Sequence, residues 1–402
     1  MQPPPPLPSP SAGDPAAPAA EERRRRRRRA VVATAVAAAA LAGAVGYAVV
    51  GGGGDSGTTG SPSPPGVTVA APARAQETIV MWRAITGTRA SPSARYDVVA
   101  LDATARRPRL LTPQLEGEAQ PLLFDRPSWS PDGERIAFTV ELDGDPAAPF
   151  RTDVYVIDAD GARVRRLTKA GRALHPVWSP DGQTIAFAKR ASSQAASPRD
   201  VLATTIWTIR SDGSAERELV PSAGVTADTP GAWSPDGRSL AFTRRTYLDP
   251  ERSLRSSTAI HVVAADGSGV RELIAGGSDP AWAPDGRSLA YASDVDRNGE
   301  LSYGDQTSFA NELYVAEADG SEPQRLTRTR DLNERSPAWS PDGTRIAFTR
   351  GEQFENAEAT SVFVVEADGG CPTEIGADAR AWYANAVWRP GESRSRFTPT
   401  CG

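Results

Sequence analysis

The chain has few of the side chains that carry most enzyme chemistry. Its 402 residues include two cysteines and two histidines. The cysteines, Cys371 and Cys401, are too few for a zinc cluster or a disulfide-rich scaffold. A G-x-S-x-G motif is absent from the sequence, which argues against a serine hydrolase of the α/β-hydrolase type. With two histidines, His175 and His261, the sequence offers little material for a catalytic triad, and we predict no catalytic residues.

Basic charge is concentrated near the N-terminus. The formal net charge is −5, yet seven consecutive arginines occupy Arg23–Arg29. The remainder of the chain is therefore more acidic than the net charge indicates. Because nucleic-acid-binding proteins present basic surfaces to phosphate, this balance argues against nucleic acid as a partner.

The segment Ala30–Val50 contains no charged residue and follows the arginines directly. As a helix its 21 residues would span about 31 Å, close to the thickness of a bilayer core. Positive charge on the N-terminal side keeps that side in the cytoplasm. We predict an uncleaved signal anchor, a single transmembrane helix over residues 30–50. The protein would then lie in the plasma membrane, with its N-terminus cytoplasmic and the rest extracytoplasmic.

Two alternatives remain open for this segment. It could belong to a cleaved signal peptide, although the small-residue pattern at Ala73 and Ala75 lies farther downstream than usual. It could also be an alanine-rich soluble helix. The flanking composition predicts a disordered Pro-rich and poly-Arg tail over residues 1–29 and a Gly/Ser/Pro linker over residues 51–76.

One phrase recurs along the rest of the chain, about every fifty residues. Five copies resemble P-x-W-S-P-D-G-x-x-I-A-F-T, and a sixth is reduced to AVWRPGE at 386–392. The repeated tryptophans are Trp129, Trp178, Trp233, Trp282, Trp339 and Trp388. Pro, Asp and Gly favour a tight turn, and I-A-F-T favours a strand, so each copy predicts a β-hairpin. Repeats of this length are typical of propellers and solenoids.

A second hairpin lies between successive tryptophan phrases. Alternating apolar residues flank an Asp-Gly turn in Asp153–Thr168 and in its counterparts 205–220, 259–274, 312–327 and 361–376. Two hairpins per repeat make a four-stranded sheet, which is one propeller blade.

The two ends of the repeat region complement each other. Residues 78–83 and 97–112 supply three strands of a blade without its first strand, whereas 386–388 is a first strand without a following blade. We therefore predict an all-β fold over residues 77–392, a six-bladed β-propeller of four-stranded blades. The C-terminal strand would close the ring, and residues 393–402 would form a tail. Closure also removes exposed sheet edges.

The phrase PxWSPDGxxIAF followed by a D-A-D-G hairpin resembles the TolB-like propeller repeat. The same repeat occurs in the propeller domains of prolyl-oligopeptidase-type peptidases. The resemblance covers about residues 77–392, and it implies a propeller that binds other proteins. It does not by itself imply an activity.

Each blade differs from the others at the position three residues before its tryptophan. The six residues there are Arg126, His175, Pro230, Asp279, Ser336 and Asn385. First strands line the central channel of a propeller, so we predict that the polar members form a ligand or peptide site at the channel mouth. Ordinary hydrated loop ends are the alternative. His261 lies within an apolar strand and is expected to pack there.

A loop in the longest repeat interval carries an EF-hand-like pattern. Oxygen-bearing residues occur at the calcium-ligand positions of the loop, which are Asp294, Asp296, Asn298, Glu300, Ser302 and Asp305. Carboxylate, amide and carbonyl oxygens at this spacing can surround one Ca²⁺, and Gly299 allows the sharp bend. The alternative is an acidic solvated loop.

Cys371 falls in the last hairpin and Cys401 in the C-terminal tail. Outside the cytoplasm the two thiols can be oxidised, and a disulfide would hold the tail against the last blade. Two free thiols are the alternative.

Three functional hypotheses follow from these features. The first is a membrane-anchored, non-catalytic propeller that binds a protein or envelope ligand, stabilised by calcium. The second is a propeller enzyme of the lactonase or lyase type that uses the central channel. The third is a scaffold or sensory protein whose N-terminal tail makes the contacts.

Overall fold

The structure is a computed structural model that describes fourteen segments of the chain. They are 78–85, 95–102, 108–112, 120–121, 125–142, 151–191, 203–248, 256–295, 300–303, 306–309, 311–329, 332–351, 360–375 and 381–391. Every regular element in them is a β-strand, as predicted. The described segments contain no helix long and apolar enough to cross a membrane, and the predicted anchor lies outside them.

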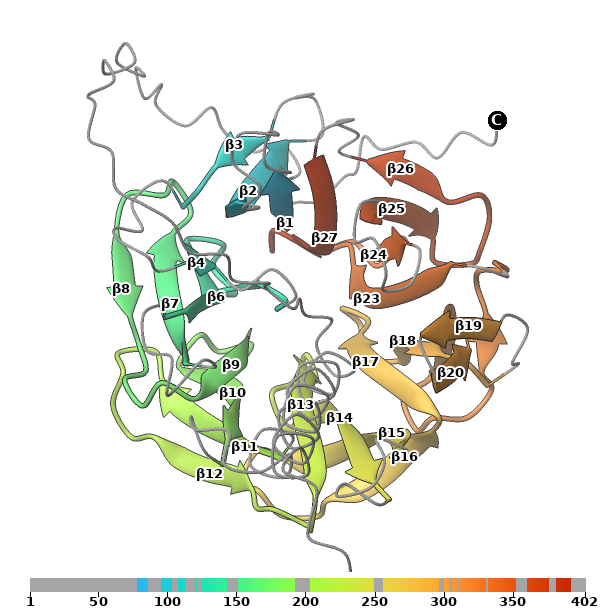
Figure 1. Cartoon of the computed structure of the whole chain (residues 1–402), viewed down its shortest axis with the longest axis horizontal. Coiled ribbons are helices and arrows are strands. Elements are labelled where there is room, and N and C mark those ends of the chain that lie inside the picture. Colours follow the sequence, from blue (N-terminus) through green and yellow to red (C-terminus); the bar gives the residue numbers. More distant parts are fainter. Residues whose placement is uncertain are drawn as a thin grey trace, which may run out of the picture.

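Most strands belong to six repeat units, each of four strands in antiparallel order (Figure 1). The innermost strands are β27 (Ala381–Trp388), β5 (Ser128–Trp129), β9 (Ala173–Trp178), β13 (Thr226–Trp233), β17 (Gly277–Trp282) and β23 (Asn333–Trp339). The second strands are β1 (Thr78–Ile85), β6 (Arg135–Glu141), β10 (Thr184–Arg190), β14 (Ser239–Tyr247), β18 (Ser288–Ser293) and β24 (Arg345–Gly351). We number the units 1 to 6 in these orders.

The third and fourth strands complete each unit toward the outside. The third strands are β2 (Arg95–Asp102), β7 (Thr152–Asp158), β11 (Thr204–Arg210), β15 (Ser256–Ala264), β21 (Glu312–Glu317) and β25 (Thr360–Glu366). The fourth strands are β3 (Arg109–Leu110), β8 (Val164–Arg166), β12 (Arg217–Val220), β16 (Arg271–Ala275), β22 (Gln324–Arg325) and β26 (Thr373–Ile375). A short strand β4 (Gln120–Pro121) also pairs with β6.

Unit 1 combines strands from the two ends of the described chain. Strand β1 pairs antiparallel with β2 on one side and with β27 on the other. Each innermost strand also contacts the innermost strand of the next unit, and β27 contacts β5. The units accordingly surround a common centre, where the inner strands face one another (Figure 1).

The repeated turn folds as its sequence predicts. In unit 3 the Ser179 hydroxyl donates to Asp181 Oδ1 at 2.5 Å, and the same oxygen accepts the Gln183 N–H at 3.0 Å. Gly182 has φ +69°, a conformation that glycine adopts without a steric penalty. The second hairpin turns on the same side, since the Ala159 N–H donates to the Glu134 carbonyl. We call this side the turn face.

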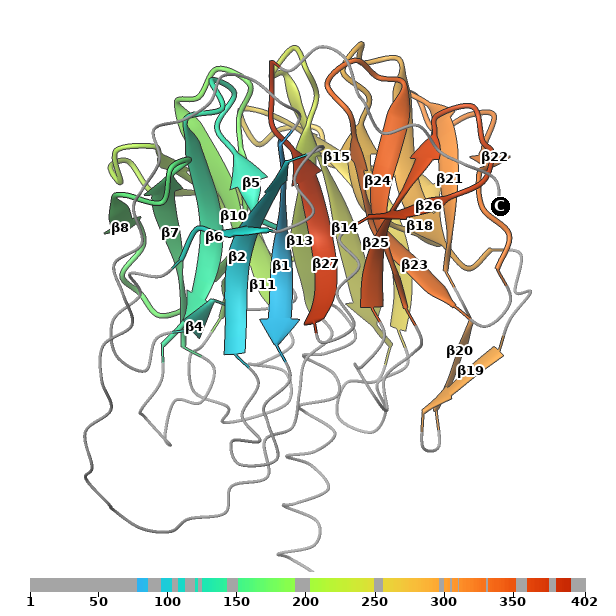
Figure 2. The ribbon, with the colours of Figure 1, turned by 90° about the horizontal axis from the view of Figure 1, so that it is seen from above.

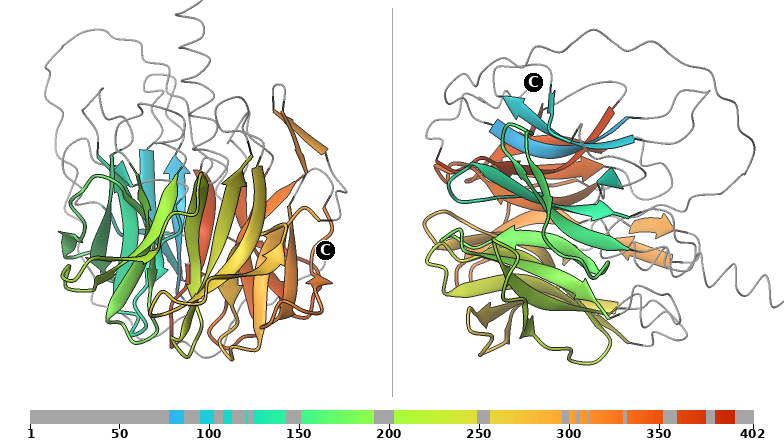
Figure 3. Two further views of the ribbon diagram at one scale, coloured as in Figure 1. Left: turned by 90° about the horizontal axis from the view of Figure 1, so that it is seen from below. Right: turned by 90° about the vertical axis from the view of Figure 1, so that its left-hand side faces the viewer.

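The opposite side carries the longer connections. Figure 2 shows the tight turns on one side of the ring, and Figure 3 shows the hairpin of β19 (Glu300–Tyr303) and β20 (Gln306–Phe309) extending from the other side. Where the chain specialises in long insertions, it does so away from the turn face.

The hydrophobic core lies between neighbouring units. The phenylalanines of the repeated I-A-F strand, Phe138, Phe187, Phe242 and Phe348, are fully buried. One cluster joins Ala137 and Val154 of unit 2 to Trp178 and Phe187 of unit 3. Burying a phenylalanine contributes about 1.5–3 kcal/mol, so each unit depends on its neighbours for its stability.

Candidate binding site on the inner strands

The inner strands share a backbone irregularity three residues before the repeated tryptophan. Four units have a residue there with φ between +53° and +56°, namely His175, Asp279, Ser336 and Asn385. The strand register shifts at the same place, as between Ala186 and Ala188 opposite His175. Residues other than glycine rarely adopt this left-handed conformation, and the surrounding structure must hold it. The positions predicted to vary therefore share one fixed backbone geometry.

A threonine of the preceding unit holds each of three bulges. The N–H of Asn385 donates to Thr349 Oγ1 at 2.8 Å, and the N–H of Asp279 donates to Thr243 Oγ1 at 2.9 Å. The third bond joins the N–H of His175 to Thr139 at 3.2 Å. These threonines end the I-A-F-T phrase, so the last residue of the repeated strand fixes the next unit.

The two units that follow an alanine instead of threonine use different solutions. After Ala188 the bulge position holds Pro230, which has no N–H to satisfy. After Ala292 it holds Ser336, whose N–H donates to Asp279 Oδ2 at 3.1 Å. The exceptions thus avoid an unpaired buried N–H, which would be costly.

Asp125 connects three units at the centre. Its side chain is fully buried, and Oδ2 accepts the N–H of His175 at 2.7 Å. Asp125 Oδ1 lies 2.6 Å from His175 Nδ1, and the Thr139 hydroxyl donates to the same carboxylate. The side-chain amide of Asn385 donates to the Asp125 carbonyl at 3.3 Å. Residues of units 1, 2 and 3 are therefore held together by one carboxylate residue.

Arg126 reaches from unit 2 to unit 6. Its guanidinium donates to the Pro337 carbonyl, whereas its buried Nε has no partner among the described residues. Burial lowers the pKa of Arg126, and the Asp279 carboxylate opposes this shift. Burial likewise lowers the pKa of Arg335, again opposed by Asp279. Asp279 therefore interacts electrostatically with two cations of the inner strands, one from unit 2 and one from unit 6.

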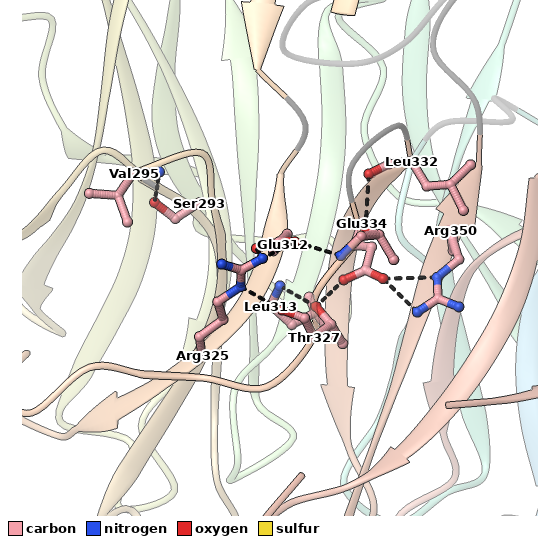
Figure 4. Close-up of polar contacts among 10 residues, drawn as sticks. Ser293, Val295, Glu312, Leu313, Arg325, Thr327, Leu332, Glu334 and Arg350 are labelled. Atoms are coloured by element: carbon pink, nitrogen blue, oxygen red, sulfur yellow. Dashed lines mark hydrogen bonds and ion pairs between the residues drawn. The ribbon is translucent and has the colours of Figure 1, made fainter. Parts of the chain in front are cut away.

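A second set of buried charges joins units 5 and 6 (Figure 4). Glu334 accepts hydrogen bonds from the Thr327 hydroxyl and from Arg350, whose Nε lies 2.8 Å from Oε1. Burial raises the pKa of Glu334, and Thr327 and Arg350 oppose the rise. Glu312 forms an ion pair with Arg325 nearby. These contacts satisfy buried carboxylates, so we assign them to the packing of the two units.

All five predicted channel residues lie on or beside the inner strands: Arg126, His175, Asp279, Ser336 and Asn385. The structure brings His175 and Asn385 together through Asp125, and Ser336 and Arg126 together through Asp279. Sequence reasoning missed Asp125 itself. Its signal is positional, because the corresponding residues in units 3 and 1 are apolar, Leu174 and Ala384. His261 lies on β15 and stacks near Phe242, as expected for a packed strand residue.

The predicted calcium loop is described only in part. Asp294 is described, Glu300 and Ser302 lie on β19, and Asp296, Asn298 and Asp305 lie outside the described residues. Within the described segments, no three His, Cys, Asp or Glu side chains are grouped to hold a metal. The calcium site stays a prediction.

The predicted disulfide is also described at one end. Cys371 is disulfide-bonded, but Cys401 lies outside the described residues. Its pairing with Cys371 therefore stays a prediction.

Comparison with known proteins gives similarity to TolB. No family model matches the chain. A curated TolB homolog of Chlorobium luteolum is 28% identical over 165 residues, which make up 41% of this chain and 32% of that protein. The match therefore covers about a third of the relative's length.

Solved structures resemble the chain in fold. A structure assigned to TolB from Agrobacterium tumefaciens aligns over 78% of this chain and 99% of its own, with 18% identity and a TM-score of 0.48. Hydrazine synthase of Kuenenia stuttgartiensis aligns over 81% of this chain and 48% of its own, with 12% identity and a TM-score of 0.54. At that identity the second similarity concerns the fold alone. The repeated phrase, the four-stranded units and the curated relative together identify the chain as a TolB-like β-propeller.

Proposed function

We propose that this protein is a non-catalytic binding module, a six-bladed propeller closed by its C-terminal strand that presents inner-strand residues to a protein or envelope ligand. The pairing of β1 with β27 and the contacts between successive inner strands support the closed ring. The TolB-like repeat supports protein binding as the function.

The set of unit-specific residues on the inner strands carries the proposal. Arg126, His175, Asp279, Ser336 and Asn385 interrupt an otherwise regular repeat. Four of them stand on left-handed bulges, and the hydrogen bonds from the preceding units hold them in place. A rigid frame with differing polar groups at its centre suits selective recognition.

The chemistry of this site favours binding over catalysis. His175 is buried, and Asp125 engages both its Nδ1 and its backbone N–H. The Arg126 guanidinium is engaged by a backbone carbonyl. Groups held in this way position the neighbouring strands, and a ligand would meet a preorganised polar surface.

Membrane attachment and calcium complete the proposal. The uncharged run 30–50 after Arg23–Arg29 supports an anchor with the propeller on the extracytoplasmic side. Protease added to intact cells should digest the propeller while residues 1–29 stay protected. Digestion only after lysis would refute this orientation.

The loop 294–305 supports a bound Ca²⁺. Removing Ca²⁺ with a chelator should lower the melting temperature of the wild type. It should leave that of an Asp294→Asn/Asp296→Asn variant unchanged, because this variant lacks two of the proposed ligands. An unchanged melting temperature in the wild type would rule out a stabilising ion.

The binding function is tested by crosslinking the anchored full-length protein in membranes, followed by mass spectrometry of the joined peptides. We expect crosslinks from the loops that surround the inner strands, and their loss in Arg126→Met/Asp279→Asn at unchanged expression. Crosslinks from residues 1–29 alone would support a scaffold whose tail makes the contacts. Turnover in a broad hydrolase and lyase screen, abolished in the same variant, would favour the enzyme alternative.

A further inference from the structure

Arginine side chains cover the repeated tryptophan at three of the six junctions between units. Arg135 of unit 2 lies over Trp178 of unit 3, with its Cζ 4.9 Å from the ring centroid. Arg345 of unit 6 lies 5.2 Å over Trp388 of unit 1. At the third junction Arg389 lies 5.6 Å over Trp129 of unit 2. A guanidinium at these distances is attracted to the indole face.

The other three junctions lack this arginine. The position held by Arg135 in unit 2 is Thr184, Ser239 or Ser288 in units 3, 4 and 5. The facing tryptophans are Trp233, Trp282 and Trp339, and in the described part of the chain no cation lies over them.

Burial of the tryptophans follows the same division at two of these junctions. Trp282 and Trp339 are only partly buried, whereas the three arginine-covered tryptophans are buried. The third uncovered indole, Trp233, is 8% exposed and lines a cleft. The missing arginines therefore leave indole surface open on consecutive junctions.

The junction of units 3 and 4 contains a cleft of about 410 Å³ on the turn face. It lies where Thr184 replaces the arginine, and the indole of Trp233 forms part of its wall. The other lining residues come from the two S-P-D-G turns and the adjacent outer strands: Ser179, Pro180, Asp181, Thr208, Arg217, Pro235, Asp236, Gly237 and Ala265.

The charges around the cleft favour a cation. The Ser179 hydroxyl and the Gln183 N–H lower the pKa of Asp181, and the Ser234 hydroxyl and the Arg238 N–H lower that of Asp236. Both carboxylates are therefore charged at neutral pH. Arg217 also lines the cleft, but its guanidinium donates to the Ala265 carbonyl at 2.9 Å. Two carboxylates thus face the cleft with one cation, which is already engaged.

We propose that this cleft receives an arginine side chain from a protein partner, in the place that the chain's own arginines take at three other junctions. The partner's guanidinium would lie against Trp233 and interact with Asp181 and Asp236. The proposal extends the proposed binding function by one specific contact. It locates that contact on the turn face, away from the inner-strand residues.

The probe is a capped peptide, acetyl-Gly-Arg-Gly-amide, compared with the peptide in which neutral citrulline replaces arginine. Binding to the full-length protein is measured by chemical-shift changes of the Trp233 indole N–H. We expect the arginine peptide to bind about 5-fold or more tightly than the citrulline peptide, because cation–π and charge contacts are lost in citrulline. Equal affinities, or no shift of Trp233 at the highest peptide concentration, would overturn the proposal.

The variant Thr184→Arg fills the cleft from within. The substitution reproduces the arrangement of Arg135, whose backbone bonds to its turn match those of Thr184. We expect this variant to fold and to lose the preference for arginine over citrulline. Retained preference would contradict the proposal. The reciprocal variant Arg135→Thr should add a second arginine-selective site at Trp178, which the Trp178 indole N–H would report.

A third variant separates this inference from the proposed function. Arg126→Met changes the inner strands and should leave peptide binding at Trp233 unaltered. If the peptide does not bind while membrane crosslinks still depend on Arg126, the arginine cleft is wrong and the binding function stands. If the peptide binds and the crosslinks are independent of Arg126, the recognition site lies on the turn face.

Discussion

Asp125 and His175 belong to different repeat units, and their side chains meet at 2.6 Å in the centre of the molecule. The same carboxylate accepts the His175 backbone N–H, so one residue fixes both the side chain and the bulge. Because Asp125 is fully buried, its charge depends on these partners.

Replacing Asp125 with alanine should therefore be strongly destabilising. We expect Asp125→Ala to lower the free energy of unfolding by about 3–5 kcal/mol, because His175 and Thr139 lose a shared buried partner. Urea denaturation followed by tryptophan fluorescence measures the change. Asp158→Ala is the control, since Asp158 pairs with an 87% exposed Arg163 and should cost at most about 1 kcal/mol. Equal losses would mean that the Asp125 contacts do not hold the units together.

The threonine clip gives a second prediction. Thr349→Val preserves the shape of a fully buried side chain but removes the acceptor of the Asn385 N–H. We expect a loss of about 1–3 kcal/mol, the penalty for an unsatisfied buried donor. The matched control is Thr344→Val on the exposed turn, with a loss of about 0.5 kcal/mol or less. A loss at Thr349 no larger than at Thr344 would contradict a structural role for the clip.

The left-handed bulge predicts an inverted order of substitutions. At Ser336, with φ +54°, glycine should be tolerated, while valine should be about 1–2 kcal/mol less stable than glycine. Ser278 also lies on an inner strand, and positive φ angles are not found there. At Ser278 valine should be the more stable substitution, because glycine weakens a strand. The same order at both positions would show that the bulge is not strained.

The turn aspartates predict how stability depends on pH. Hydrogen bonds from Ser179 and Gln183 hold the pKa of Asp181 below its usual 3.8. A lowered native pKa stabilises the fold above the unfolded value, and this contribution is lost as the pH falls through the native value. Asp181→Asn should therefore flatten the loss of stability below about pH 4.

Asp228 is the control with the opposite sign. Burial raises its pKa, although Arg244 opposes the rise. Its contribution is present below the unfolded pKa and lost as the pH rises through the native value, so Asp228→Asn should not flatten the acid limb. Identical pH profiles for Asp181→Asn and wild type would refute the role of the turn aspartate.

The hairpins could be predicted from the sequence because their determinants are local. Period-two alternation, Asp-Gly turns and the repeated tryptophan fix each strand, and the pairing of β1 with β27 follows from the incomplete units at the two ends. The position three residues before the tryptophan could also be predicted, because it varies within a regular repeat. Its left-handed conformation was not predicted, since residues such as Ser336 carry no glycine signal.

Contacts between units were beyond sequence reasoning. Asp125 meets His175 only because unit 2 lies beside unit 3, and Arg126 meets Pro337 from a distance of 211 residues along the chain. The charged pair Glu334–Arg350 depends on burial that a single strand does not reveal. Local patterns specify strands, whereas the site depends on how the strands are arranged around the centre.

The inner-strand site requires that the last strand complete the first unit, since β27 carries Asn385 to Asp125. Hydrogen–deuterium exchange at the backbone amides of β1 tests this pairing most directly. Strand β1 lies between β2 and β27, so its amides should exchange as slowly as those of β6, an inner-lying strand of unit 2. If alternate amides of β1 exchange rapidly, as on an unpaired edge strand, the ring is open and the proposed site is not assembled.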